Sequence, residues 1–276
     1  MGMRISTNVA ALNSQRHLTT TSRGLQNSLA QLSSGSRINR AADDAAGLAI
    51  SENMKAQIRS STQARRNAND GISLVATAEG GLTETSNLIT RIRELGIQSA
   101  SDTVGDRERG YINLEVQQLK SEMDRIANTS SWNTTKLLDG STPVFDFQIG
   151  VYSSEYDRIS FDSSQVVSTL AGLGLADVDL STKEGAKGSI DQLDEAQNRV
   201  HGMRSSIGSL QNRLLATVDT LAVTEENLAA ANSRIRDTDI AESSSELARN
   251  TVLQQAGVAS LAQANQSTQL ALKLIG

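Results

Sequence analysis

The sequence lacks, or nearly lacks, several residues on which common protein chemistry depends. Its 276 residues include no cysteine, two histidines and one proline, Pro143. The absence of cysteine excludes disulfide bonds and thiolate ligands. The histidines, His17 and His201, stand far apart and in no catalytic or metal-binding motif, so we expect no catalytic site, no metal and no cofactor. A single proline leaves few interruptions for helices, which favours a mainly α fold.

Aromatic residues are few, and no sign of charge dominates. All of the aromatic residues lie between Tyr111 and Phe161, so both long flanks pack with Leu, Ile, Val and Ala, which suits thin, elongated helical rods. The net charge of −5 arises from 26 basic and 31 acidic residues in mixed order. We therefore expect no nucleic-acid binding. The lack of any long apolar run predicts no membrane insertion, and the polar start of the chain lacks the apolar core of a signal peptide.

The clearest pattern in the chain runs from Leu193 to Ile235. Steps of three and four residues meet no charged side chain, which places one stripe along one side of an α-helix. The seven-residue repeat is typical of a coiled-coil seam. A helix of this length, roughly 65 Å at 1.5 Å per residue, depends on partner helices that bury the stripe. The predicted seam comprises Leu193, Val200, Ile207, Leu214, Leu221, Leu228 and Ile235.

Two earlier helices can cover this seam. The first is expected over residues 45–100, with a weak point at Gly80–Gly81. The pair Asp43–Asp44 could be read as a metal or acid pair, but a helix cap is the better interpretation. The second helix follows Asp106 and carries apolar residues at alternating steps of four and three. Together with the seam, the two helices predict an antiparallel bundle.

A different pattern follows the second of these helices. Phe145, Phe147, Ile149 and Val151 alternate with polar or smaller residues, which predicts a strand, and 158–161 is its expected hairpin partner. Residues 172–188 have the composition of a loop. The expected fold is therefore mainly α: an elongated antiparallel helical bundle, or coiled-coil rod, with a small β-hairpin region and paired N- and C-terminal helices.

Both termini carry amphipathic segments that this bundle leaves uncovered. Serine, threonine and asparagine crowd the first segment, and small residues fill the middle of the last, so neither is stable alone. Either the two segments pair with each other and with neighbouring copies, or they are frayed ends. The apolar positions available for such contacts are Ile5, Val9, Leu12, Leu18, Leu25, Leu29 and Leu32, and then Ile240, Leu247, Leu253, Leu261, Leu270 and Leu274.

Three stretches resemble bacterial flagellin, in the order that this family shows. They read MRISTNVAALNSQRHL at the N-terminus, SSGSRINRAADDAAGLAIS from Ser33, and SRIRDTDIAESSSELARNTVLQQAGVASLAQANQ from Ser233. The resemblance covers about residues 1–140 and 187–276. It implies a structural subunit that self-polymerises into the extracellular flagellar filament for motility. It also implies export through the flagellar type III apparatus, contacts with hook-associated and cap proteins, and an export chaperone on the C-terminal helix.

The same resemblance implies a division of the chain. Residues 1–32 and 240–276 would form the inner, filament-core layer, 33–44 and 236–239 the connectors, and 45–235 a helical rod that includes the β-hairpin region at about 140–165. Arg91, Leu95 and Glu115 match positions by which many flagellins are sensed by a vertebrate innate immune receptor. Two alternatives remain: a hook–filament junction protein of the same family, and an enzyme carried on the same rod, which the absence of histidine and cysteine from the central insert disfavours.

Overall fold

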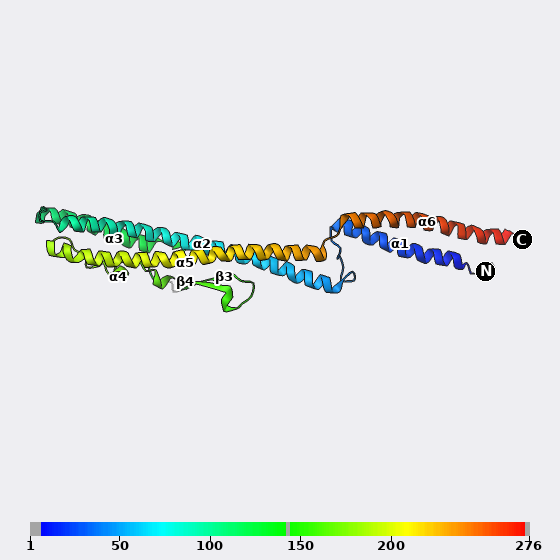
Figure 1. Ribbon diagram of the computed structural model, residues 1–276, viewed down its shortest axis with the longest axis horizontal. Coiled ribbons are helices and arrows are strands. Elements are labelled where there is room, and N and C mark those ends of the chain that lie inside the picture. The colour runs from blue at the N-terminus through cyan, green and yellow to red at the C-terminus, as the bar shows by residue number, and fades with distance from the viewer. Residues whose placement is uncertain (1–6, 142–143, 274–276) are drawn as a thin grey trace. The chain divides into compact units, whose positions relative to one another are not determined.

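The computed structural model describes residues 7–141 and 144–273 and is mainly α-helical in this part of the chain (Figure 1). The helices are α1 (Val9–Ser34), α2 (Ala45–Ser99), α3 (Asp106–Thr129), α4 (Leu170–Leu173), α5 (Lys183–Arg236) and α6 (Ile240–Lys273). The strands are β1 (Ser131–Trp132), β2 (Thr135–Lys136), β3 (Val144–Gln148) and β4 (Arg158–Asp162), with short 3₁₀ turns at Glu155–Asp157 and Ser163–Gln165. The predicted fold class is confirmed.

The described chain divides into two compact units. One contains the residues up to Ala56 and those from Asn227 onward, and the other contains Gln57–Glu226. Both boundaries therefore fall inside the long helices α2 and α5 and not at the connectors proposed from the sequence. The assignment of filament-core and rod regions stays a proposal.

The core of the Gln57–Glu226 unit lies where α2, α3 and α5 run side by side (Figure 1). Leu82, Ile89 and Ile92 of α2 are fully buried, as are Val116 and Met123 of α3. Burial of each such side chain stabilises the fold by roughly 1.5–3 kcal/mol. The first four seam residues of α5, Leu193, Val200, Ile207 and Leu214, are buried in the same core, whereas Leu221, Leu228 and Ile235 are half-buried.

One feature of this unit agrees with the sequence expectations, and another differs from them. Helix α2 is the single long helix expected over 45–100 and continues without a break through Gly80–Gly81, where the Leu138 side chain packs over the second glycine. The segment 172–188 is not all loop, because α5 begins at Lys183. The Thr182 hydroxyl oxygen accepts a hydrogen bond from the Gly185 amide at 3.1 Å, so a side-chain cap starts the helix in spite of its glycines.

The β-hairpin packs against α2. Strands β3 and β4 are antiparallel, with Phe145 opposite Phe161, and the two rings stack at a centroid distance of 6.1 Å. Phe147 lies over Gly71, and the Asn67 amide nitrogen donates to the Gln148 carbonyl oxygen at 2.9 Å. The predicted alternation is therefore correct for the two phenylalanines, although β3 ends before Ile149 and Val151.

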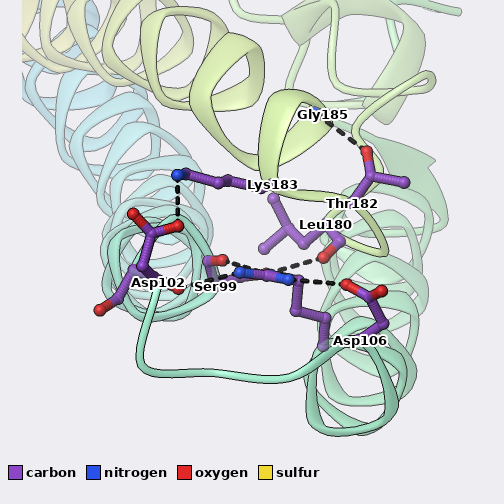
Figure 2. Close-up of polar contacts among 9 residues, drawn as sticks. Ser99, Asp102, Asp106, Leu180, Thr182, Lys183 and Gly185 are labelled. Carbon is purple, nitrogen blue, oxygen red and sulfur yellow. Dashed lines mark hydrogen bonds and ion pairs between the residues drawn. The ribbon is translucent and has the colours of Figure 1, made fainter.

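At one end of this bundle, around the turn between α2 and α3, positively charged side chains bind backbone carbonyl and carboxylate groups (Figure 2). The Arg109 guanidinium, in a side chain only 8% exposed, donates to the Ser99 and Ser101 carbonyl oxygens, each at 2.9 Å, and to the Asp106 carboxylate at 2.7 Å. The Ser99 hydroxyl donates to the Leu180 carbonyl oxygen, and Lys183 pairs with Asp102. The carbonyl groups that end α2 thus receive donors from side chains.

Lys120 acts in the same way on the segment before α5. Its ammonium group donates to the carbonyl oxygens of Ala176 and Val178 at 2.7 and 3.1 Å. Burial lowers the pKa of Lys120, while Asp177 and Asp179 nearby act in the opposite direction. None of these cations was singled out from the sequence.

Candidate assembly interface

The first and last helices, α1 and α6, lie side by side and antiparallel within the other compact unit (Figure 1). The Asn8 side-chain oxygen accepts a hydrogen bond from the Ala11 amide and caps α1, and its amide nitrogen donates to the Ala264 carbonyl oxygen at 2.9 Å. The Asp239 carboxylate accepts from the amides of Ala241 and Glu242 and caps α6. Local capping thus fixes where each helix begins.

Two glycines set the close approach of α1 and α6. A Cβ atom at Gly24 would lie 3.1 Å from the Asn250 side-chain nitrogen, and one at Gly257 would lie 2.9 Å from a Leu18 methyl carbon. Each helix therefore presents a glycine to a side chain of the other. The sequence analysis counted Gly257 among the small residues of the last segment and did not single out Gly24, because only the pairing shows what each glycine faces.

The connectors beside this pair are hydrogen-bonded to each other. The Arg37 amide donates to the Arg236 carbonyl oxygen at 2.6 Å, and the Thr238 amide donates to the Gly35 carbonyl oxygen at 3.1 Å. The Arg37 guanidinium donates to the Ile235 carbonyl oxygen at 2.7 Å, at the end of α5. Asp44 caps α2 by accepting from the Gly47 amide at 2.8 Å, which supports the cap interpretation.

The helix pair has no apolar core of its own in the part that the structure describes. Up to residue 267, the buried side chains of α1 and α6 are Ser28 and Ser243, and no apolar side chain of either helix is buried. Leu18, Leu25, Leu32, Leu247 and Leu261 are half-buried between the helices. The outer faces expose Val9, Leu12, Leu29, Ile240, Val252, Leu253 and Val258, each at least 50%.

Some of the predicted terminal positions cannot be placed. Ile5 and Leu274 lie outside the described residues, and Leu270 lies in α6 but its side chain is not described. The positions that are described divide between the half-buried and the exposed sets. Large exposed apolar sets of this kind mark surfaces that bind other molecules.

Residues Arg91, Leu95 and Glu115 lie in the other unit and do not form one exposed patch. Arg91 of α2 pairs with Glu115 of α3 at 2.9 Å and with Glu94 at 3.1 Å, and all three side chains are partly exposed. Leu95 is only 3% exposed and belongs to the bundle core. The arginine and the glutamate can therefore contact a partner, whereas the leucine supports the helix beneath them.

Several other kinds of site find no support in the described residues. Between residues 7 and 273, apart from 142–143, no three histidine, aspartate or glutamate side chains gather in a way that could hold a metal ion. His201 is exposed and contacts Gln197 on its own helix at 3.2 Å. In this same part of the chain, no helix combines the length and the apolar character needed to cross a membrane.

Comparison with known proteins places this chain in a family. Residues 5–142 match the bacterial flagellin N-terminal helical region, and residues 190–275 match the bacterial flagellin C-terminal helical region. A flagellin of Halalkalibacterium halodurans is 44% identical over 273 residues, with 99% of this chain and 100% of the relative covered. The flagellar filament core protein flaB2 of Brachyspira hyodysenteriae is 42% identical over 288 residues, with the same coverage.

A solved structure agrees with these relatives. The crystal structure of Bacillus cereus flagellin superposes with a TM-score of 0.51 at 26% identity and covers 60% of this chain and 94% of its own. The two family models together span most of the sequence, and the full-length relatives exceed 40% identity. The chain belongs to the bacterial flagellin family.

Proposed function

We propose that this chain is a structural subunit of the extracellular bacterial flagellar filament, and that copies join mainly through the α1–α6 pair. The observation that carries this proposal is the missing core: up to residue 267, the two paired helices bury no apolar side chain. Full-length relatives are named as flagellin and as flagellar filament core protein, which favours the filament over the hook–filament junction.

The exposed apolar side chains are sufficient to drive association. Burial of the exposed half of each would stabilise a contact by roughly 1 kcal/mol. Seven such side chains on α1 and α6 would then contribute about 7 kcal/mol per copy before the entropy of ordering is subtracted. Residues 1–32 and 240–276 would accordingly form the filament core, joined through 33–44 and 236–239 to the rod at 45–235.

Removal of residues 240–276 provides the direct test. The truncated chain should lose polymerisation, seen as the absence of filaments in negative-stain micrographs, while circular dichroism still reports a folded helical bundle. A truncated chain that formed filaments would contradict the proposal.

A point substitution gives a finer test. Val252→Gln on α6 should raise the critical concentration for polymerisation about fivefold, because it removes roughly 1 kcal/mol of apolar burial. Val223→Gln on α5 is the matched control, since the two valines are exposed by 63% and 57%. Equal effects of the two substitutions would argue against an interface centred on α1 and α6.

Further partners follow from the family resemblance. We infer that the subunit is exported through the flagellar type III apparatus, contacts hook-associated and cap proteins, and binds an export chaperone along α6, around 247–275. The exposed apolar residues of this helix, among them Leu253 and Val258, offer a groove-binding chaperone the surface it needs. A chaperone that bound equally well to a chain lacking 247–275 would contradict this inference.

We also propose that the innate immune receptor contacts the exposed pair Arg91 and Glu115. Replacement of either residue by alanine should weaken activation of receptor-expressing reporter cells. Arg125→Ala is the matched control, because Arg125 forms a similar ion pair with Glu122 on α3, at 2.6 Å. If all three variants activate the cells equally, the pair is not part of the recognised surface.

A further inference from the structure

The N-terminal part of the chain carries charge of one sign only. Residues 1–42 contain five arginines, Arg4, Arg16, Arg23, Arg37 and Arg40, and no aspartate or glutamate. The reverse holds where α6 begins: residues 237–248 contain Asp237, Asp239, Glu242 and Glu246 and no lysine or arginine. In a chain whose other charges are mixed, these two stretches form a complementary pair of surfaces.

The charges in the middle of these surfaces have no partner among the described residues of one copy. Among the residues that the structure describes, Arg16, Arg23, Glu242 and Glu246 form no ion pair and no side-chain hydrogen bond, and all four are exposed. By contrast, Arg37 is engaged at the end of α5, and the carboxylate of Asp239 caps α6. Arg249 lines the same hollow as Glu246 and offsets part of the negative charge there.

The arginines share one face of α1. Arg16 and Arg23 are seven residues apart, or two helical turns, and with Leu12, Gln15, Thr19 and Thr20 they line a shallow groove along the helix. Leu12, 53% exposed, adds an apolar side chain to this face. Helix-dipole effects explain a glutamate in the first turn of α6, but they do not explain arginines in the middle of α1.

The antiparallel pairing keeps the opposite charges apart within one copy. Leu18 lies against Gly257 and Gly24 against Asn250, so the two arginines lie level with the part of α6 that follows Asn250. The glutamates precede it, which leaves the two charge centres about ten residues, or about 15 Å, apart along the axis. A copy shifted by this distance brings them together.

We propose that Arg16 and Arg23 of one copy bind the acidic start of α6, at Glu242 and Glu246, in a neighbouring copy of the chain. This inference rests on the proposed self-polymerisation and specifies which surfaces meet. The contact joins two different surfaces, so it is heterologous, and a heterologous contact with an axial shift continues from copy to copy and does not close into a dimer. The charges therefore select direction and register, while apolar burial supplies most of the affinity.

Charge exchange in the full chain tests this contact. The variants R16E/R23E and E242R/E246R should each raise the critical concentration for polymerisation by about tenfold or more, because attraction becomes repulsion. The fourfold variant R16E/R23E/E242R/E246R restores opposite signs and should polymerise within about threefold of the wild type. The control R59E/R66E reverses two exposed arginines with the same spacing on α2 and should leave the critical concentration unchanged.

The salt dependence of polymerisation is a second measurement, which tests the contact even if the charge-reversal variants fold poorly. The neutral variant R16Q/R23Q should keep its helix content by circular dichroism, and its critical concentration should depend less on sodium chloride than that of the wild type. Reversal variants that polymerise like the wild type, a fourfold variant no better than the twofold ones, or equal salt dependence would overturn the charge contact. So would reversals that impair binding to another flagellar protein but not self-polymerisation. A wild-type chain that forms no filaments would instead contradict the proposed function itself.

Discussion

Replacement of Arg109 by methionine should destabilise the Gln57–Glu226 unit, in which α2, α3 and α5 pack together (the three-helix unit), by about 3 kcal/mol. The guanidinium donates to the Ser99 carbonyl oxygen at the end of α2, to the Ser101 carbonyl oxygen in the turn that follows, and to Asp106. A hydrogen bond from a charged donor contributes roughly 1.5–3 kcal/mol when buried. The Asp106 side chain is 93% exposed, so its ion pair adds little. Methionine fills similar volume without donors, and most of the loss therefore comes from the two carbonyl bonds.

Urea unfolding followed by circular dichroism measures this loss as a lower midpoint with an unchanged slope. Arg125→Met is the control, because Arg125 and Glu122 form an exposed ion pair within α3 and should contribute less than about 1 kcal/mol. If Arg109→Met lowers the free energy of unfolding by no more than Arg125→Met does, the hydrogen bonds from Arg109 do not stabilise the bundle, and the prediction from buried donors is wrong.

Three further predictions concern separate parts of the chain. Gly257→Leu should weaken the α1–α6 pair and raise the critical concentration for polymerisation, whereas Gly208→Leu, where a Cβ meets nothing within 4 Å, should not. Thr134→Gly should raise the free energy of unfolding by about 0.5–1 kcal/mol, measured by urea unfolding, because Thr134 has φ +72° in the β1–β2 turn. The hydrogen bond from Arg93 lowers the pKa of Asp194 below its ordinary value, so the stabilisation from this pair is fully present above the ordinary pKa and is lost as the pH falls through the lowered pKa. In Asp194→Asn, the free energy of unfolding should therefore fall less steeply below about pH 4 than in the wild type, measured by urea unfolding at several pH values. An equally steep fall in both proteins would contradict this.

Periodicity in the sequence was sufficient to find the long helices. Steps of three and four residues report which side of a helix is apolar, and that signal is strong in α2, α3 and α5 because their stripes are buried along most of their length. Alternation likewise identified β3, since Phe145 and Phe147 face the core. The pairing of α1 with α6 followed from a simpler argument, because two amphipathic ends were left without partners.

Other features depend on contacts that no local pattern reports. Gly185 and Gly188 give the start of α5 the composition of a loop, and packing of Ala186 against the core outweighs their poor helix propensity. Arg109 and Lys120 are buried, although charged residues usually indicate the side of a helix that faces solvent. They are buried because each donates hydrogen bonds to backbone carbonyl groups that would otherwise have no partner. Leu95 is a different case: it lies on the apolar stripe of α2 with Ile92, so periodicity already indicated that it faces the core, although the family match grouped it with the exposed Arg91 and Glu115.

The α1–α6 pair, which buries no apolar side chain between residue 7 and residue 267, also determines how an unassembled copy would be degraded. Segments that bury little open often and at small free-energy cost, and proteases cut the open state. In a free copy, cleavage should therefore begin in α1 and α6 and leave the three-helix unit intact. A copy inside a filament would resist cleavage at the same bonds. The small apolar burial within the α1–α6 pair would thus promote assembly and also make unassembled copies easy to degrade.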